Sequence, residues 1–238
     1  MNDDVGRPSS AGHRFPPESS AHAVWRYCRF ARSDREVAEL LAARGVIVTD
    51  ETVRRWCRTF GQGDAHALRR RRPRPGDTWH RDAVFSGSND VRHSRWRAVD
   101  QDGNVLDLLV RRRRDTAAVR KCFRTLLKGL RYVPRVVITD TLARYGAAKR
   151  AVLPSVEHRQ HRRRNKRAEH AHQPTRARER RMRRFKRPRH AQRFLATYGP
   201  IAAHFRPRRQ RLTATAYRRQ RDDACATWRA VTGVAAAA

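Results

Sequence analysis

Hydrophobic residues early in the chain recur at the spacing of an amphipathic helix. Val37 and Leu41 lie on one helical face, and they follow Ser33 and Glu36, which have the spacing of a capping box. We expect Gly45 to end this helix in the C′ position, where a left-handed backbone favours glycine. The pattern therefore predicts a short capped helix before residue 45.

A second helix is expected to start at Thr49 or Asp50, with its apolar residues on one face and arginines largely elsewhere. Two short helices joined by a tight turn indicate a helix-turn-helix, whose second helix enters the major groove of DNA. The alternative is a helical hairpin that packs on a larger domain. The arginines favour DNA contact, and the candidates are Arg54, Arg55 and Arg58.

From Trp79 onward the hydrophobic pattern becomes that of β-strands. Short β-like runs cover residues 79–85, 91–99 and 105–110, with turn residues between them. A helix follows, which Asp115 can cap and Gly129 is expected to close. Three strands followed by a helix are typical of a domain with both helices and a sheet.

The most continuous strand pattern is Val133–Thr139, whose β-branched run suits a strand buried on both faces. It ends at Asp140. Beyond Glu169 we expect a helix that runs through Phe185, and a last helical stretch from His190 to His204. This order predicts an α/β fold with a mixed sheet and flanking helices, preceded by a small all-α domain.

Composition and patterning together suggest five segments. They are a disordered lead over residues 1–20, a helix-turn-helix domain over 21–62, a basic Pro/Gly linker over 63–77, the α/β domain over 78–186, and a basic helical region and tail over 187–238.

The net charge of the chain indicates what kind of molecule it binds. The 238 residues contain 56 Lys or Arg against 22 Asp or Glu, so the formal net charge is +34. Only five of the basic residues are lysines, and guanidinium groups bind phosphate in a bidentate manner. We therefore expect a nucleic acid as the partner, bound with an affinity that falls as salt rises.

The compartment follows from what the sequence lacks. No segment approaches the roughly 20 apolar residues that span a bilayer, and the acidic N-terminus does not read as a signal peptide. The four cysteines have no zinc-finger spacing, and Cys122 suits a small buried hydrophobe. We expect a cytoplasmic, nucleoid-associated protein with no membrane contact and no structural metal.

A basic run between Glu157 and His190 holds fifteen Lys or Arg and only three acids. A charge run is often just a solvated surface, but this imbalance favours contact with phosphates. The candidate phosphate contacts are Arg176, Arg180, Arg183 and Lys186.

Acidic residues set against apolar structure are informative in so basic a chain. Asp82 lies in the first strand, Asp140 ends the buried strand, and Glu169 opens the basic helical region. Carboxylates placed in this way can converge at the edge of a sheet and hold two Mg²⁺ ions for an in-line phosphoryl displacement. Each also has a plainer interpretation: an exposed edge residue for Asp82, a helix cap for Asp140 and an ion pair for Glu169.

Several segments are specific enough to indicate a family. Together they closely resemble the bacterial IS6-type (IS26-like) insertion-sequence transposases, in order from about Tyr27 to about Thr232. The segments are the Ser33–Glu36 helix with Arg44-Gly45, Thr52 to Trp56, Arg69 to Asp82, Trp96 to Gly103, and His170 to Pro174 with Met182 and Phe185.

The resemblance implies a helix-turn-helix that recognises terminal inverted repeats, followed by an RNase H-like catalytic domain with a DDE triad. Residue by residue, the triad falls on Asp82, Asp140 and Glu169. The implied reaction frees a 3′-hydroxyl at the element end, which attacks target DNA and leads to a cointegrate. The implied cofactor is a pair of Mg²⁺ ions, for which Mn²⁺ can substitute, and the implied assembly is a homo-oligomer on its DNA ends.

The sequence also departs from the family pattern. Ala83 stands where a second acid usually follows the first aspartate, and Ser94-Arg95 replaces an aromatic-aliphatic pair. A buried and unpaired Arg95 would cost several kcal/mol. Two alternatives therefore stay open: a degenerate copy that binds DNA ends without catalysis, and an arginine-rich structural protein that binds nucleic acid.

Overall fold

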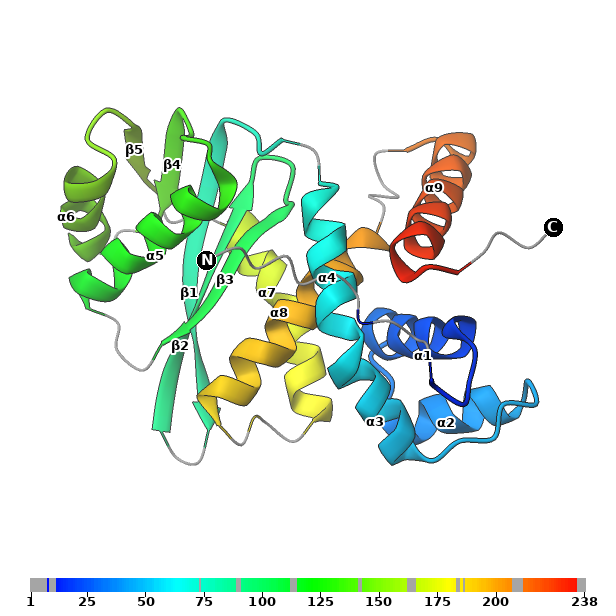
Figure 1. Ribbon diagram of the computed structural model, residues 1–238. Helices are drawn as coiled ribbons and strands as arrows, with labels where there is room; N and C mark the ends of the chain where they lie inside the picture. Colours follow the sequence, from blue (N-terminus) through cyan, green and yellow to red (C-terminus); the bar gives the residue numbers. More distant parts are fainter. Residues whose placement is uncertain are drawn as a thin grey trace. The chain divides into compact units, whose positions relative to one another are not determined.

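A computed structural model describes most of the chain, and its contacts divide the chain into two compact units (Figure 1). One unit is Met1–Arg72 with Ala196–Ala238, and the other is Pro73–Leu195. The structure describes residues 8, 12–72, 74–88, 91–111, 115–140, 143–161, 166–182, 185, 187–206 and 212–234, with the side chains of 84–88, 91–93, 111, 143–144 and 166–171 left out.

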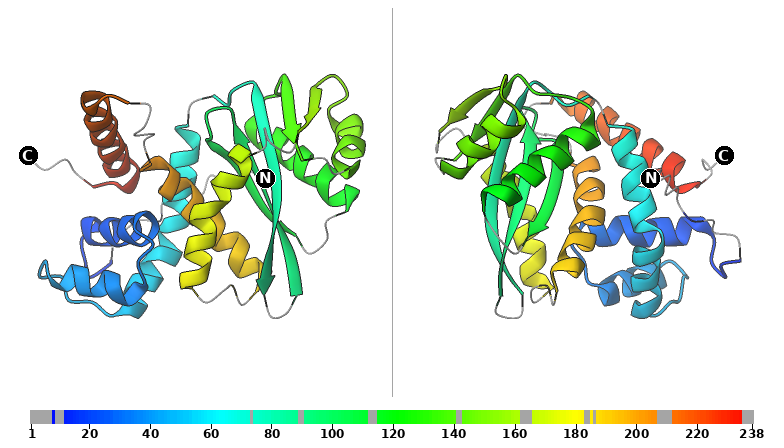
Figure 2. Two further views of the ribbon diagram at one scale, coloured as in Figure 1. Left: turned by 180° about the vertical axis from the view of Figure 1, so that it is seen from behind. Right: turned by 60° about the vertical axis from the view of Figure 1, so that its left-hand side comes forward.

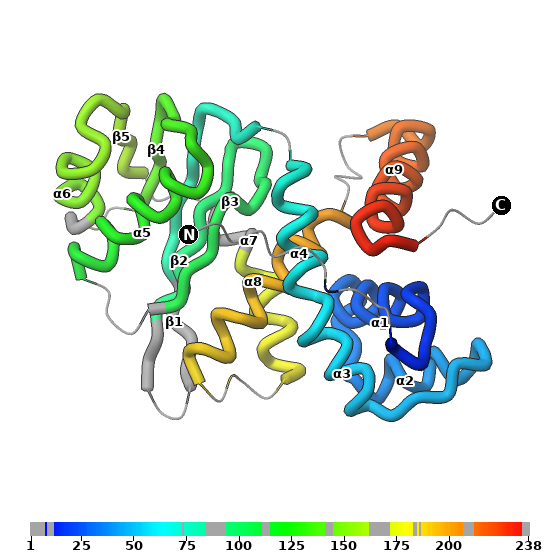
Figure 3. The backbone as a smooth tube through the Cα atoms, viewed as in Figure 1, coloured from blue at the N-terminus to red at the C-terminus, as the bar shows by residue number. Residues whose placement is uncertain are grey.

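The first unit is helical, and Figure 3 follows its backbone. Its elements are α1 (Pro17–Arg29), α2 (Asp34–Ala42), α3 (Asp50–Thr59), α4 (Gly61–Arg70), the end of α8 (Pro188–His204), and α9 (Ala214–Thr232). Helices α1 to α3 enclose an apolar core formed by Ala23, Val37, Leu41, Val53, Trp56 and Phe60.

Both predicted helix starts are confirmed. The Ser33 hydroxyl accepts from the Glu36 backbone N–H at 3.1 Å, and the Glu36 carboxylate accepts from the Ser33 backbone N–H at 2.7 Å. Thr49 caps α3 by accepting from the Thr52 N–H. Gly45 has the expected positive φ of 76°, but it lies two residues beyond the C-cap of α2.

Two helices of this unit differ from the prediction. Helix α1 begins inside the segment expected to be disordered, because Pro17 is well suited to the first turn of a helix and Val24 and Cys28 pack inward. Helix α4 occupies most of the predicted linker. The linker prediction is wrong for residues 63–70, because Ala65 and Leu68 are buried and outweigh the arginines that follow.

The second unit is built on a five-stranded mixed sheet. Its strand order is β3-β2-β1-β4-β5, with β1, β2 and β3 antiparallel and β4 and β5 parallel to β1. This is the RNase H-like arrangement, and it confirms the predicted fold class. The strands are β1 (Thr78–Ser88), β2 (Val91–Asp100), β3 (Val105–Arg111), β4 (Val136–Thr139) and β5 (Glu157–Gln160).

The sheet is flanked by α5 (Thr116–Leu130), α6 (Ala143–Val152), α7 (Lys166–Arg181) and the start of α8. Asp115 caps α5 as predicted. Gly129 does not close that helix, because Arg131 takes the left-handed conformation at its end, with φ of 50°. Strand β4 starts three residues later than predicted, after Pro134, which has no N–H for a ladder. Strand β5 was not predicted.

The two faces of the sheet carry different layers. Helix α5 covers one face in Figure 1, and α7 covers the other, which comes to the front in the left view of Figure 2. The α5 face is an apolar core that contains Ala83, Trp96, Val119, Cys122 and Phe123. The buried position of Cys122 fits the prediction of a small hydrophobe. Among the described residues, no helix is long and apolar enough to cross a membrane.

Candidate functional site

The register of the sheet brings two of the predicted acids together. Strands β1 and β4 are parallel, and their last printed pair matches Arg81 with Thr139. Asp82 follows Arg81 on β1, and Asp140 follows Thr139 at the end of β4. The two residues therefore occupy neighbouring positions, because adjacent strands lie about 4.8 Å apart. Asp82 is 7% exposed, and Asp140 is partly exposed at the end of its strand.

The third predicted acid lies on a helix that packs over the same position. Helix α7 contacts β1 and β2, and it buries His172, whose Nε2 lies 3.8 Å from Asp82 Oδ2. Glu169 is three residues before His172, so it occupies the same face of α7, one turn closer to the N-terminus. The side chain of Glu169 lies outside the described part of the structure.

Charged groups hold α7 on the sheet. Arg95 of β2 is 1% exposed, and its Nη1 lies 2.9 Å from Glu179 Oε2. Arg97, two residues further along the strand, donates from Nη2 to Thr175 Oγ1 at 2.6 Å. Burial lowers the pKa of Arg95, while Glu179 acts in the opposite direction. Arg95 is therefore buried as a paired charge, which removes the unpaired-charge penalty expected from the sequence.

His172 is uncharged in this setting. Its side chain is fully buried, and burial together with the charges of Arg97 and Arg95 lowers its pKa to about 2. The backbone of Asp82 acts in the opposite direction but does not outweigh these effects. His172 therefore faces Asp82 as a neutral imidazole rather than as a cation.

The departure at Ala83 lies away from this cluster. Successive strand residues alternate between faces, so Ala83 lies on the face opposite Asp82, in the apolar core beneath α5. Arg81 shares that face, and its guanidinium lies 4.2 Å from the ring centroid of Phe123. A carboxylate at position 83 would be buried among apolar side chains. The absence of a second acid at this position therefore leaves the Asp82 side of the sheet unchanged.

The arrangement offers hard oxygen donors at one edge of the sheet. Asp82 and Asp140 supply carboxylates at neighbouring positions, which is the ligand type that Mg²⁺ prefers. Among the side chains that the structure describes, no group of three or more His, Cys, Asp or Glu side chains forms a metal cluster. The side chain of Glu169, the third member of the predicted triad, is not among these described side chains.

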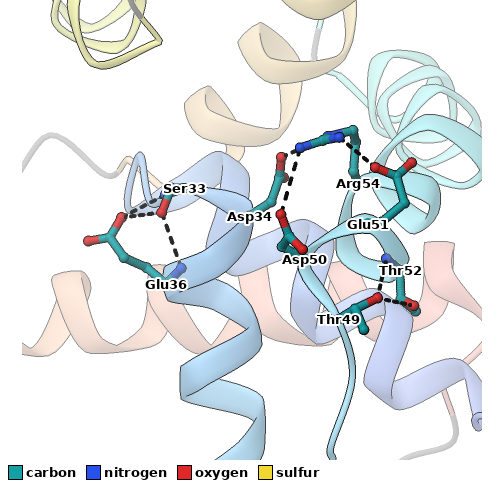
Figure 4. Close-up of polar contacts among 8 residues, drawn as sticks. All are labelled: Ser33, Asp34, Glu36, Thr49, Asp50, Glu51, Thr52 and Arg54. Atoms are coloured by element: carbon teal, nitrogen blue, oxygen red, sulfur yellow. Dashed lines mark hydrogen bonds and ion pairs between the residues drawn. The ribbon is translucent and has the colours of Figure 1, made fainter.

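The predicted DNA contacts on α3 differ in their surroundings, and Figure 4 shows those of Arg54. The guanidinium of Arg54 forms ion pairs with Asp34 at 3.3 Å, Asp50 at 3.9 Å and Glu51. Arg55 and Arg58 are exposed, and neither forms an ion pair with a carboxylate in the described residues. The charge of Arg54 is therefore largely used within the helical unit, whereas Arg55 and Arg58 present theirs outward.

The predicted phosphate contacts after Glu169 are only partly visible. Arg176 and Arg180 are exposed on α7, whereas Thr175 and Glu179 are buried against the sheet, and the charge of Arg176 contributes to the lowered pKa values of Arg95 and His172. Arg183 and Lys186 lie outside the described residues. Helix α7 thus combines a face buried on the sheet with an exposed basic face.

Sequence reasoning missed the residues that join α7 to the sheet: His172, Thr175 and Glu179 on the helix, and Arg97 on the strand. The spacing of Glu169, His172 and Glu179 along one helical face was a usable signal. Another signal was the alternation of Arg95 and Arg97 with apolar residues in β2, because buried arginines require partners.

Comparison with protein families gives a match over residues 76–208, more than half of the chain, to the family described as a DDE domain. The chain is 30% identical over 118 residues to the transposase for insertion sequence element IS257 in transposon Tn4003 from Staphylococcus aureus. It is 29% identical over 118 residues to the transposase for insertion sequence-like element IS431mec from S. aureus strain Mu50. Each match covers 50% of this chain and 52% of the relative, so the chain spans about half the length of the relatives it matches.

Solved structures give weaker similarity. The HTLV-2 integrase catalytic core domain in complex with magnesium matches with a TM-score of 0.32 and 14% identity, over 38% of this chain and 64% of that one. The simian T-cell lymphotropic virus intasome in complex with PP2A regulatory subunit B56 gamma also gives a TM-score of 0.32 and 14% identity, over 60% of this chain and 51% of the other.

Proposed function

This chain belongs to the DDE-domain family of IS6-type insertion-sequence transposases, and from that premise we propose that it cuts and joins DNA strands at the ends of such an element. The observation that carries the proposal is the register of β1 and β4, which makes Asp82 and Asp140 neighbours. Glu169, on the α7 face that packs over Asp82, is the third member of the proposed triad.

Asp82, Asp140 and Glu169 would hold two Mg²⁺ ions, or Mn²⁺ in their place. Such ions, when bound, activate the attacking oxygen and stabilise the leaving oxygen of a phosphodiester. The protein contributes the fixed geometry, because Asp82 is buried on a central strand and α7 is tied to that strand's neighbour. Water would first hydrolyse a phosphodiester at the element end and free its 3′-hydroxyl. That hydroxyl would then attack a phosphorus of the target strand, form the new phosphodiester and expel the target's own 3′-oxygen.

The helical unit would recognise the terminal inverted repeats. Arg55 and Arg58 are exposed on α3 and form no ion pair within the described residues, so we propose them as the main contacts, with Arg54 in a supporting position. Arg176 and Arg180 would follow the phosphates of donor or target DNA, together with Arg183 and Lys186. A homo-oligomer on the two DNA ends would join them in a cointegrate, in the cytoplasm at the nucleoid.

Two observations favour an active enzyme over a degenerate copy. Arg95 has a carboxylate partner, so its burial does not leave a lone charge. Ala83 lies in the apolar core on the opposite face, away from the proposed metal ligands. These two departures therefore neither replace a proposed metal ligand nor leave a buried charge unpaired.

The test is a cointegration assay in cells, with the gene placed between its own flanking repeats on a donor plasmid. The wild type should give cointegrates, and Asp140→Asn should abolish them. Asp107→Asn is the matched control, because Asp107 lies on β3, away from β4. If neither wild type nor variants give cointegrates while the protein still shifts a repeat-bearing fragment, it is a binding relic. Loss of repeat-specific binding as well would support the structural alternative.

A further inference from the structure

We infer that His172 is a positioning residue that orients the Asp82 carboxylate toward a bound divalent ion, an inference that rests on the proposed function. His172 is 0% exposed, and its Nε2 lies 3.8 Å from Asp82 Oδ2. It belongs to α7, the helix that also carries Glu169. One buried side chain thus connects the strand and the helix that supply two of the three proposed metal ligands.

The polar contacts that His172 makes among the described residues are with Asp82. Neither ring nitrogen has a side-chain hydrogen bond of good geometry there, although the whole side chain is buried. The ring interacts with the backbone of Asp82, and its Nε2 faces the carboxylate of the same residue. A buried polar group that loses its partner costs about 1–3 kcal/mol. We therefore expect the imidazole to hold Asp82 in place rather than only to fill space in the core.

The distance to Asp82 fits a contact that closes when the site is loaded. A separation of 3.8 Å is too long for a hydrogen bond. Hydrogen bonds in active sites are often long without substrate and shorten in the reacting complex. A modest rotation of the Asp82 carboxylate would let the Nε2–H donate to Oδ2. That rotation would turn the other carboxylate oxygen, Oδ1, toward the proposed ion.

Two contacts beyond His172 hold α7 on β2, the strand that pairs with β1. Thr175, one turn further along α7, accepts from Arg97, whose Cα is paired with Asp82 across the β1–β2 ladder. Glu179, a further turn on, pairs with Arg95. Donors that orient metal-bound carboxylates typically change metal affinity or activity by 10–100-fold when they are removed.

The first measurement is binding of Mn²⁺ to the purified full-length chain, followed by electron paramagnetic resonance. His172→Leu removes the N–H, whereas His172→Gln keeps an N–H donor near the position of Nε2. We expect His172→Leu to weaken Mn²⁺ binding by about 10–100-fold and His172→Gln to recover most of that loss. His190→Leu, in the same unit but packed against Phe185, should bind Mn²⁺ as the wild type does.

Thermal unfolding of each variant separates positioning from folding. Equal Mn²⁺ affinity in the wild type and His172→Leu would overturn the inference. An equal loss in the leucine and glutamine variants would also overturn it, because a donor would then not matter. If Mn²⁺ binding follows the predicted order but no variant or wild type forms cointegrates, the proposed function fails while the role of His172 stands.

Discussion

The two faces of the central sheet are built by opposite means. Beneath α5 the contacts are apolar, with Trp96 and Phe123 almost fully buried among aliphatic side chains. Beneath α7 the contacts are polar, with Arg95 on Glu179 and His172 on Asp82, although Leu108 and Val110 of β3 join an apolar cluster on the same face. The polar contacts of this face include the carboxylate groups that we propose for the chemistry.

The different contacts on the two faces suit different roles, one in stability and the other in function. Burial of apolar area stabilises a fold without requiring a particular geometry, so the α5 face can supply most of the stability of this unit. A buried ion pair contributes little net stability, because desolvation offsets its attraction, but it tolerates only one geometry. The α7 face therefore suits a site in which Asp82 must be held in one place.

The largest expected effect on stability is in the apolar face. Phe123→Ala leaves a cavity and removes the ring on which the Arg81 guanidinium lies. We expect the free energy of unfolding to fall by about 3–5 kcal/mol, measured by urea denaturation. Phe123→Leu is the matched control and should cost less. A loss below about 1 kcal/mol for the alanine variant would show that the α5 face does not dominate stability.

The charged face should respond to single and double changes in different ways. Glu179→Met leaves Arg95 buried without its carboxylate and should cost roughly 3 kcal/mol, and Arg95→Met is the other single variant of the cycle. The double variant Arg95→Met with Glu179→Met should recover most of that loss, because neither charge remains to be desolvated. The readout is a double-mutant cycle of unfolding free energies. Additive losses would mean that the pair is not coupled.

A smaller change tests whether α5 serves stability alone. Asp115 accepts from the Ala118 N–H at 2.7 Å at the start of α5. Asp115→Ala should lower the free energy of unfolding by about 1 kcal/mol. It should leave the frequency of cointegrates unchanged when the cells are grown below the melting temperature. A large loss of cointegrates in a folded protein would link the apolar face to the chemistry.

The smallest effect is expected outside the sheet and depends on pH. Hydrogen bonds from the Ser33 backbone, Arg32 and the Ser33 hydroxyl lower the pKa of Glu36 from 4.5 to about 2. Because the folded-state pKa is depressed, this carboxylate stabilises the helical unit above about pH 4.5 and loses that effect as the pH falls toward 2. The stability difference between wild type and Glu36→Gln should therefore be present near neutral pH and shrink in acid. A difference that is constant with pH would contradict the capping box.

The sequence predicted the fold because its local signals agree with the tertiary structure. Three helix caps lie at the predicted residues, which are Ser33, Thr49 and Asp115. The β-branched residues before Asp140 form a strand, as predicted. It predicted Asp82 and Asp140 as partners, but only the pairing register places them side by side.

Other features needed contacts that are distant in sequence. The contacts of Arg95 with Glu179 and of Arg97 with Thr175 join residues about eighty positions apart, so no local pattern shows them. Helix α4 was hidden in the same way, because the arginines that end it resemble a linker. Burial of Leu68 decides its structure, and burial is a tertiary property.

We propose that the α7 face of the sheet carries the chemistry and that the α5 face supplies most of the stability of this unit. Asp82→Asn tests it most directly, with cointegrate frequency and the free energy of unfolding measured on the same variant. The account predicts a loss of cointegrates of more than about 100-fold, with stability within about 1 kcal/mol of the wild type. Cointegrates that persist in a folded Asp82→Asn protein would contradict it.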